Sequence, residues 1–116
     1  MDIKDIEAKV DVAVNLLKAL SNERRLTIIC ALYKCEKSVG ELEQIVGLSQ
    51  SALSQHLARL RRDGLVNTRR EAQTIYYSMN DRATEAILRC LYDIYSPEDE
   101  EAPLLDGSGG GSVSSS

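Results

Sequence analysis

The sequence contains no tryptophan and no phenylalanine, and its only aromatic side chains are five tyrosines. A hydrophobic core must therefore be built from leucine, isoleucine and valine. The 116 residues make one small domain, and a core of that size would gain from association with a second copy. The three cysteines, Cys30, Cys35 and Cys90, lack the regular spacing of a disulfide framework, which indicates a reducing compartment.

Long apolar runs are also missing. None approaches the roughly 18 residues that a membrane span needs, and the N-terminal residues MDIKDIEAKV lack the pattern of a signal peptide. We therefore expect a cytoplasmic protein with no membrane partner. The single histidine, the lack of a Gly-rich phosphate loop and the lack of a Ser/His/Asp set that could be placed together leave no catalytic constellation, so we do not expect an enzyme.

Charge is unevenly distributed along a chain whose formal net charge is -4. Between residues 50 and 70, five arginines against one aspartate give +4; from residue 81 onward, two arginines against eight acids give -6. A basic stretch inside an acidic protein is typical of a surface that binds a polyanion.

Apolar residues at alternating spacings of three and four predict one long helix over residues 2–20. They are Ile3, Ile6, Val10, Ala13, Leu17 and Leu20. This seam suits packing against another helix, within the subunit or across a dimer. A second helix is expected after Ser21-Asn22, running to about Tyr33 and burying Leu26, Ile29 and Leu32.

Capping residues predict two further helices joined by a tight turn. Ser38 and Glu41 form a capping box, and the short helix that they open has Val39, Leu42, Ile45 and Val46 inward and ends at Gly47. Ser49 then caps a helix from Gln50 to about Asp63. This arrangement is typical of a helix-turn-helix.

The period changes after Gly64. Residues 65–70 and 74–78 alternate like two strands of a hairpin, with Glu71–Gln73 as the turn. Asn80 or Asp81 caps a last helix running to Tyr95, with an apolar stripe of Ala83, Ile87, Cys90, Leu91 and Ile94. The fold class is mainly α with a small β-hairpin, a winged helix-turn-helix of order α-α-α-α-β-β-α. Residues 1–96 form this domain, and residues 97–116 form an acidic, then Gly/Ser-rich disordered tail whose last ten residues resemble an engineered linker.

The helix opened by Ser49 has a face suited to a DNA major groove. With Leu53, Leu57 and Leu60 inward, the opposite face holds Ser51, Gln55, Ala58 and Arg62, flanked by Ser54 and Arg59. Ser and Gln offer hydrogen bonds to base edges. Phosphate contacts are expected from Ser49 and Gln50 at the helix N-terminus. Arg69, Arg70 and Gln73 at the wing tip can reach the DNA backbone or the minor groove, and His56 is a packing or phosphate contact. A merely solvated helix face, or a protein-interaction module, is the alternative.

These segments resemble the ArsR/SmtB winged-helix regulators, and in particular their thiol-based, BigR/SqrR/HlyU-like branch. The resemblance covers about residues 7–96 and is carried by NERRLTIICALY, SVGELEQIVGLSQSALSQHLARLRRDGLV, NTRREAQTIYYSM and ILRCLYDIYS. It implies a transcriptional repressor or anti-silencer that binds an inverted-repeat operator in double-stranded DNA. It also implies a homodimer built on the first and last helices.

The family's metal ligands do not match this sequence. Ser38 and Gly40 stand where arsenic- and cadmium-type members carry Cys-x-Cys, and Ala83, Ile94 and Pro97 stand at zinc-ligand positions. No metal and no cofactor are therefore expected.

Redox sensing by thiols matches in part. Cys30 matches the first sensing cysteine of the thiol-based branch, and Ser96 stands at the expected second position. Three explanations remain open. Ser96 replaces a cysteine in an engineered variant, or Cys90 has taken over the role of the second sensing cysteine, or the protein is a regulator without an effector switch.

Overall fold

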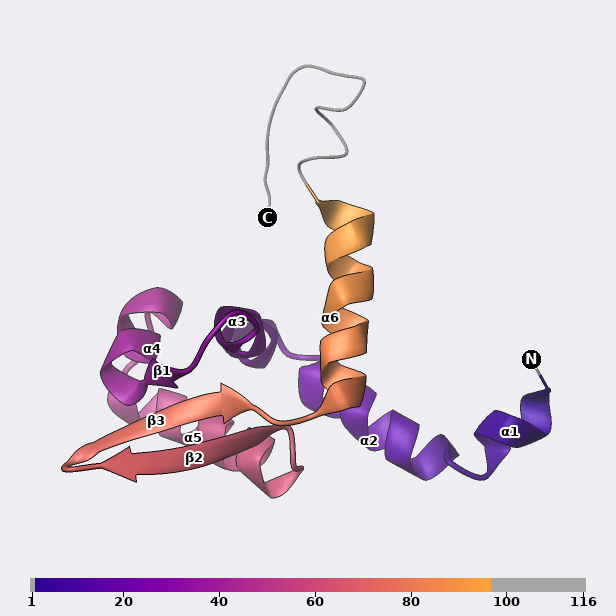
Figure 1. Cartoon of the computed structure of the whole chain (residues 1–116), viewed down its shortest axis with the longest axis horizontal. Helices are drawn as coiled ribbons and strands as arrows, with labels where there is room; N and C mark the ends of the chain where they lie inside the picture. The colour runs from indigo at the N-terminus through magenta and orange to yellow at the C-terminus, as the bar shows by residue number, and fades with distance from the viewer. Residues whose placement is uncertain (1, 97–116) are drawn as a thin grey trace, which may run out of the picture. The chain divides into compact units, whose positions relative to one another are not determined.

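The structure, a computed structural model, describes residues 2–96 (Figure 1). Its elements are α1 (Ile3–Glu7), α2 (Val10–Leu20), α3 (Glu23–Leu32), β1 (Lys37–Ser38), α4 (Val39–Val46), α5 (Gln50–Arg62), β2 (Val66–Glu71), β3 (Thr74–Met79) and α6 (Arg82–Tyr95). The chain divides into two compact units between Thr84 and Glu85. The predicted tail, residues 97–116, lies outside the described residues. Among the residues described, no helix is long and apolar enough to cross a membrane.

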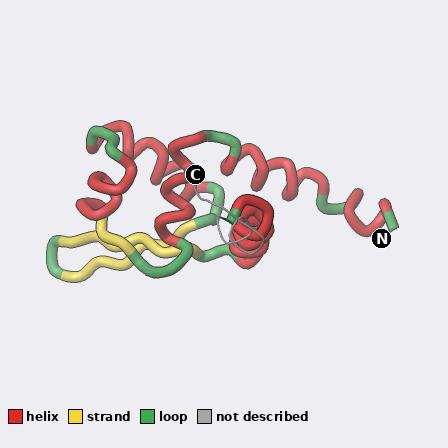
Figure 2. Tube along the Cα trace, turned by 90° about the horizontal axis from the view of Figure 1, so that it is seen from above, coloured by secondary structure: helices red, strands yellow, loops and turns green. Residues whose placement is uncertain are grey.

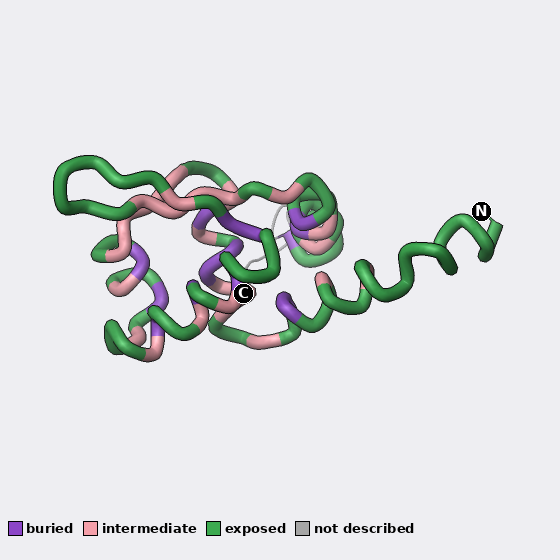
Figure 3. Tube along the Cα trace, turned by 90° about the horizontal axis from the view of Figure 1, so that it is seen from below, coloured by how far each residue is buried: buried purple, intermediate pink, exposed green. Residues whose placement is uncertain are grey.

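The N-terminal seam does not form the single predicted helix. The helix is interrupted at Ala8 and Lys9, and Lys9 has a non-helical backbone (φ -118°, ψ 14°). Asp2 caps α1 through a hydrogen bond from the Lys4 amide (3.1 Å), but α1 contains no buried residue. Because no packing holds this short helix in phase with α2, only weak local propensity favours continuity. Figure 3 shows α1 and most of α2 as exposed.

Helices α3, α4 and α5 supply most of the core of the first unit (Figure 3). Asn22 caps α3 as predicted, its side chain accepting from the amides of Arg24 and Arg25. Ile28, Ile29 and Leu32 are buried along α3, whereas Leu26, expected inside, is only half-buried. On α4, Leu42 and Val46 are buried as expected, but Ile45 is 49 % exposed. In this unit the buried apolar residues are Ala19, Leu20, Ile28, Ile29, Leu32, Leu42, Val46, Leu53, Leu57, Leu60, Leu65 and Val66.

The helix-turn-helix is confirmed. Ser38 Oγ accepts from the Glu41 amide at 3.1 Å, and Glu41 Oε1 accepts from the Ser38 amide at 2.8 Å, which completes the capping box. Gly47 ends α4 in the left-handed conformation (φ 75°), where a side chain would be strained. Two residues later Ser49 opens α5, so the turn between α4 and α5 is short.

The hairpin belongs to a three-stranded antiparallel sheet of order β1-β3-β2. β2 and β3 pair from Val66 opposite Met79 to Glu71 opposite Thr74, so Glu71 lies in the strand and the turn is Ala72–Gln73 (Figure 2). Ala72 takes a positive φ of 57° there. The sequence did not predict β1, because its two residues carry no periodicity; they are in a strand through pairing with Tyr76 and Tyr77 of β3.

Helix α6 starts after Asp81, whose Oδ2 accepts hydrogen bonds from the Thr84 amide (3.0 Å) and hydroxyl (2.6 Å). Its predicted apolar stripe is wrong by about one residue. Thr84 and Leu88 are buried, Ile87 and Leu91 are half-buried, and Ala83, Cys90 and Ile94 are exposed. A threonine whose hydroxyl is satisfied by Asp81 occupies the buried stripe, so apolar periodicity alone gives the wrong phase.

Candidate nucleic-acid interface

The orientation of α5 is fixed by three leucines. Leu53, Leu57 and Leu60 are at most 2 % exposed, and they turn the opposite side of the helix to solvent. That side carries no large apolar residue and consists of Ser51, Ser54, Gln55, Ala58, Arg61 and Arg62. The predicted groove face is therefore exposed except at Arg59, which is half-buried, and its contacts with bases remain a prediction.

The N-terminus of α5 is also exposed. Ser49 Oγ accepts from the Ala52 amide at 3.3 Å, and both Ser49 and Gln50 are exposed. An exposed helix N-terminus presents amide donors and a partial positive charge, which favour a phosphate group. Ser49 and Gln50 are therefore exposed at a helix N-terminus, and their phosphate contacts remain a prediction.

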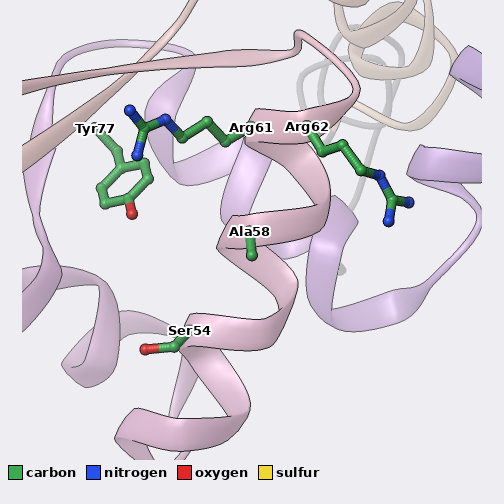
Figure 4. Close-up of a pocket in the computed structure, with 5 residues that line it drawn as sticks. All are labelled: Ser54, Ala58, Arg61, Arg62 and Tyr77. Carbon is green, nitrogen blue, oxygen red and sulfur yellow. The ribbon is translucent and has the colours of Figure 1, made fainter.

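A hollow of about 440 Å³ adjoins this face. Ser54, Ala58, Arg61 and Arg62 line it from α5, and Tyr77 lines it from β3 (Figure 4). Figure 4 shows the Arg61 side chain extended toward the Tyr77 ring, whereas Arg62 points to the other side of the helix. Neither Arg61 nor Tyr77 was among the predicted site residues. Arg61 lies within the basic run, but only the pairing register places Tyr77 beside α5.

Asp63 holds two of the arginines of α5. Its carboxylate accepts from Arg59 Nε at 2.9 Å and lies 3.5 Å from Arg62 Nε. The hydrogen bond from Arg59 is the main cause that lowers the pKa of Asp63. Arg61, by contrast, forms no ion pair or hydrogen bond of its side chain with the part of the chain that the structure describes. The basic run is therefore partly neutralised within the protein.

The two neighbouring arginines of the wing lie on opposite faces of the hairpin. Successive side chains of a strand alternate between faces, and the register pairs Arg70 with Ile75 and Arg69 with Tyr76. Arg70 consequently shares a face with Tyr77, which lines the hollow beside α5. Within residues 2–96, the Arg70 side chain has no hydrogen bond or ion pair.

Arg69 is surrounded by partners. Its Nη2 and Nε lie 2.7 and 3.1 Å from the two carboxylate oxygens of Glu36, and its Nη1 lies 2.7 Å from Glu71 Oε1. Its guanidinium also lies 4.5 Å from the centroid of the Tyr76 ring. The hydrogen bond from Arg69 lowers the pKa of Glu36, and the two carboxylates raise the pKa of Arg69. The predicted phosphate role of Arg69 thus competes with an internal one.

His56 and Gln73 complete the predicted set. His56 is half-buried, and burial, followed by the charges of Arg25 and Arg24, lowers its pKa. A neutral, half-buried imidazole fits the packing role better than the phosphate role. Gln73 is exposed at the tip of the hairpin, next to the positive-φ Ala72.

The cysteines are free and exposed. Partial burial of the Cys30 thiol raises its pKa, which disfavours the reactive thiolate. Cys35 Sγ accepts a hydrogen bond from Lys37 Nζ at 3.0 Å. The expectation that Cys90 lies on a buried stripe is wrong, whereas Ser96 is only 6 % exposed.

Residues 2–96 contain no cluster of three or more His, Cys, Asp or Glu side chains that could hold a metal ion.

Comparison with known proteins gives consistent matches. The sequence model of the family described as "Bacterial regulatory protein, arsR family" matches residues 22–68. The transcriptional activator HlyU of Vibrio cholerae is 54% identical over 95 residues, covering 82% of this chain and 88% of that protein. The structure of reduced HlyU from Vibrio cholerae superposes with a TM-score of 0.76 at 54% identity, covering 80% of this chain and 98% of that one. The crystal structure of the transcriptional repressor BigR from Xylella fastidiosa superposes with a TM-score of 0.78 at 41% identity, covering 81% of this chain and 96% of that one.

Proposed function

The chain belongs to the arsR family of bacterial regulatory proteins and is a DNA-binding transcriptional regulator with a winged-helix fold, and we propose that it binds an inverted-repeat operator as a homodimer. Each subunit inserts one α5 into a major groove, so the two-fold symmetry of the dimer matches that of the operator. We place the protein in the cytoplasm, together with its DNA. Bound to the operator, it acts as a repressor or anti-silencer. Its close relatives are transcription regulators, and it is not an enzyme.

The exposed polar face of α5 carries this proposal. Ser51, Ser54 and Gln55 offer hydrogen bonds to base edges, and Ala58 allows the helix to approach them closely. The hollow between α5 and Tyr77 has the two arginines Arg61 and Arg62 on its rim. We assign it to the phosphodiester backbone that flanks the groove.

The unpaired arginines set the sequence-independent part of binding. Arg61 and Arg70 have no carboxylate partner within residues 2–96, whereas Arg59 and Arg69 are held by Asp63, Glu36 and Glu71. A free guanidinium releases counterions from DNA without first breaking an internal ion pair. Arg61 and Arg70 are therefore the main phosphate contacts, with Ser49, Gln50, Arg62 and Gln73 beside them.

Exposed apolar side chains support the homodimer. Ile3, Ile6, Val10 and Leu17 of the N-terminal seam are 40–73% exposed. On α6, Tyr92, Ile94 and Tyr95 are 58–74% exposed. Apolar surface on two helices of one chain is typical of an interface between copies. We assign it to dimerisation through the first and last helices.

Replacing Gln55 tests base reading. Fluorescence anisotropy is measured on DNA upstream of the protein's own gene and on a random-sequence duplex of the same length. Gln55→Ala should weaken binding to the cognate site by roughly ten- to hundredfold, since a good base contact discriminates by about 1–3 kcal/mol. Binding to random DNA should hardly change. Gln44→Ala, at an exposed position of α4, is the matched control and should affect both duplexes alike. Equal losses on both duplexes for Gln55→Ala would refute its role in base reading.

The phosphate assignment has a separate test. Arg70→Gln should weaken binding to both duplexes and reduce the slope of log affinity against log salt by about 0.9. An unchanged slope would show that Arg70 does not contact phosphate.

We further propose that Cys30 and Cys90 respond to an organic persulfide, because both residues are exposed to solvent, although partial burial raises the pKa of the Cys30 thiol. Treatment should weaken DNA binding reversibly, and Cys30→Ser and Cys90→Ser should each abolish the response, whereas Cys35→Ser should not. Binding unchanged by treatment would instead identify a regulator without an effector switch, and Ser96→Cys would be the next variant.

A further inference from the structure

Arg69 connects three carboxylate and aromatic partners that lie on different strands or loops. Two of its nitrogens form a fork with the Glu36 carboxylate (2.7 and 3.1 Å), the third reaches Glu71 (2.7 Å), and the guanidinium lies over the Tyr76 ring. We call these four residues the Arg69 clip. Each guanidinium nitrogen donates one hydrogen bond to a carboxylate, so three of the five N–H donors of Arg69 are already used and its charge is already paired.

The clip spans the whole sheet. Arg69 lies on β2, Tyr76 lies opposite it on the central strand β3, and Glu36 directly precedes β1 on the other side of β3. β1 has only two residues and pairs with β3 at two positions, so backbone hydrogen bonding holds it weakly. The carboxylate fork from Glu36 to Arg69 adds a second connection between this edge and the wing.

The same edge begins the helix-turn-helix. Ser38 ends β1 and is also the N-cap of α4, with no residue between strand and helix. Glu36 is two residues upstream. The clip therefore joins the wing to the element that positions α4 and, through its short turn, α5.

We propose that Glu36 and Arg69 are positioning residues for DNA binding, and that Arg69 itself contacts no phosphate. They hold the wing at the angle at which Arg70 and the polar face of α5 meet the same duplex. Arg69 is on the face of the hairpin opposite to Arg70 and Tyr77, which agrees with an indirect role. The inference rests on the proposed function, in which α5 and the wing bind DNA together.

The expected effect is moderate. Arg69 and Glu36 side chains are 49% and 35% exposed, and exposed ion pairs are individually weak. The fork geometry and the aromatic ring add to the interaction. We expect loss of the clip to weaken DNA binding about three- to fivefold, the change that corresponds to a surface interaction of this kind.

Glu36→Gln gives the sharpest test, because two explanations predict opposite signs. Removing an acid from a DNA-binding surface should by itself tighten binding to a polyanion. If Glu36 positions the wing, binding to a 30-base-pair random-sequence duplex should instead weaken about threefold. Glu43→Gln on α4 is the matched control, because the Glu43 side chain has no partner within residues 2–96; it should bind equally or slightly more tightly. Tighter binding by Glu36→Gln would overturn the proposal.

The salt dependence separates positioning from phosphate contact. Arg69→Gln should weaken binding about as much as Glu36→Gln while leaving the slope of log affinity against log salt unchanged. The double variant should be no weaker than either single one, since both remove the same interaction. A slope reduced by about 0.9 in Arg69→Gln would identify a phosphate contact, and additive losses would show that the two residues act separately; either result refutes the clip.

Two controls keep these outcomes distinct. Thermal unfolding followed by circular dichroism establishes that each variant is folded at the assay temperature, and if Arg69→Gln is not, Glu36→Gln and Glu71→Gln carry the test. Arg70→Gln and Gln55→Ala test the interface itself. If neither variant changes DNA binding, the proposed DNA interface is wrong. If only the clip is wrong, Arg70→Gln and Gln55→Ala still weaken DNA binding.

Discussion

The packed part of the first unit, from α3 to β3, buries its apolar residues, whereas α1 and most of α2 leave similar residues exposed. Ile28, Ile29 and Leu53 are completely buried, whereas Ile3 and Leu17 are 73% and 56% exposed. Both regions show helical periodicity in the sequence. Periodicity therefore identifies an apolar face but does not say which molecule covers it, and here it marks an internal core in one region and a proposed subunit interface in the other.

The largest expected effect lies in the packed region. Leu57→Ala removes a side chain that is 2% exposed and should lower the free energy of unfolding by about 2–5 kcal/mol. Urea denaturation at low protein concentration measures the change. Leu17→Ala is the control, and under these conditions it should cost much less. Equal losses would show that α2 is as much a part of the single-chain core as α5.

A charge placed on the N-terminal seam should weaken homodimerisation without disturbing the fold of the single chain. Leu17→Glu places a carboxylate on an exposed apolar side of α2 and should weaken homodimerisation by at least about tenfold, because a buried unpaired charge is costly at an interface. Analytical ultracentrifugation measures the dissociation constant, and circular dichroism should show unchanged helix content. A dimer of unchanged affinity would place the interface elsewhere.

The helix caps offer a matched pair with a smaller effect. Ser38→Ala removes one half of the capping box at α4 and should lower the free energy of unfolding by about 1 kcal/mol. Asp2→Ala removes the cap of α1, a helix without buried residues, and should leave the unfolding transition unchanged. A comparable loss for Asp2→Ala would mean that α1 unfolds together with the packed region.

The smallest difference concerns pH. Arg59 lowers the folded-state pKa of Asp63, at the end of α5, so the folded protein binds this proton less readily than the unfolded chain does. The resulting stabilisation is complete above the ordinary carboxyl pKa of about 4 and is lost as pH falls through the lowered value. In acid titrations of stability, Asp63→Asn should be less sensitive over that range than the wild type. Identical profiles would show that the ion pair does not contribute.

Local rules predicted the elements that depend on near neighbours in sequence. The caps at Asn22, Ser38 and Ser49 and the leucine phase of α5 were correct because each is decided within one or two helical turns. The break at Lys9 was missed because the seam looks continuous when its covering partner is not considered. The phase of α6 was wrong because buried Thr84 is polar and its hydrogen bond to Asp81 is invisible to an apolar count.

The interface shows the same limit. The exposed face of α5 was predicted from periodicity. The partner of Arg69 is Glu36, which lies 33 residues away in the sequence. Tyr77 lines the hollow beside α5 because of the strand pairing, which the sequence pattern does not specify. Neighbouring Arg69 and Arg70 look equivalent in composition, and only the pairing of β2 with β3 separates them.

The separation of Glu36 and Arg69 along the chain has a kinetic consequence. The turn between α4 and α5 closes over a few residues, whereas the clip must close a loop that contains the whole helix-turn-helix, at a larger entropic cost. We expect the helix pair to form first and the clip to close late in folding, so that Arg69→Gln speeds unfolding and leaves the folding rate nearly unchanged. Stopped-flow chevron plots measure both rates; a slower folding arm would place the clip in the folding nucleus.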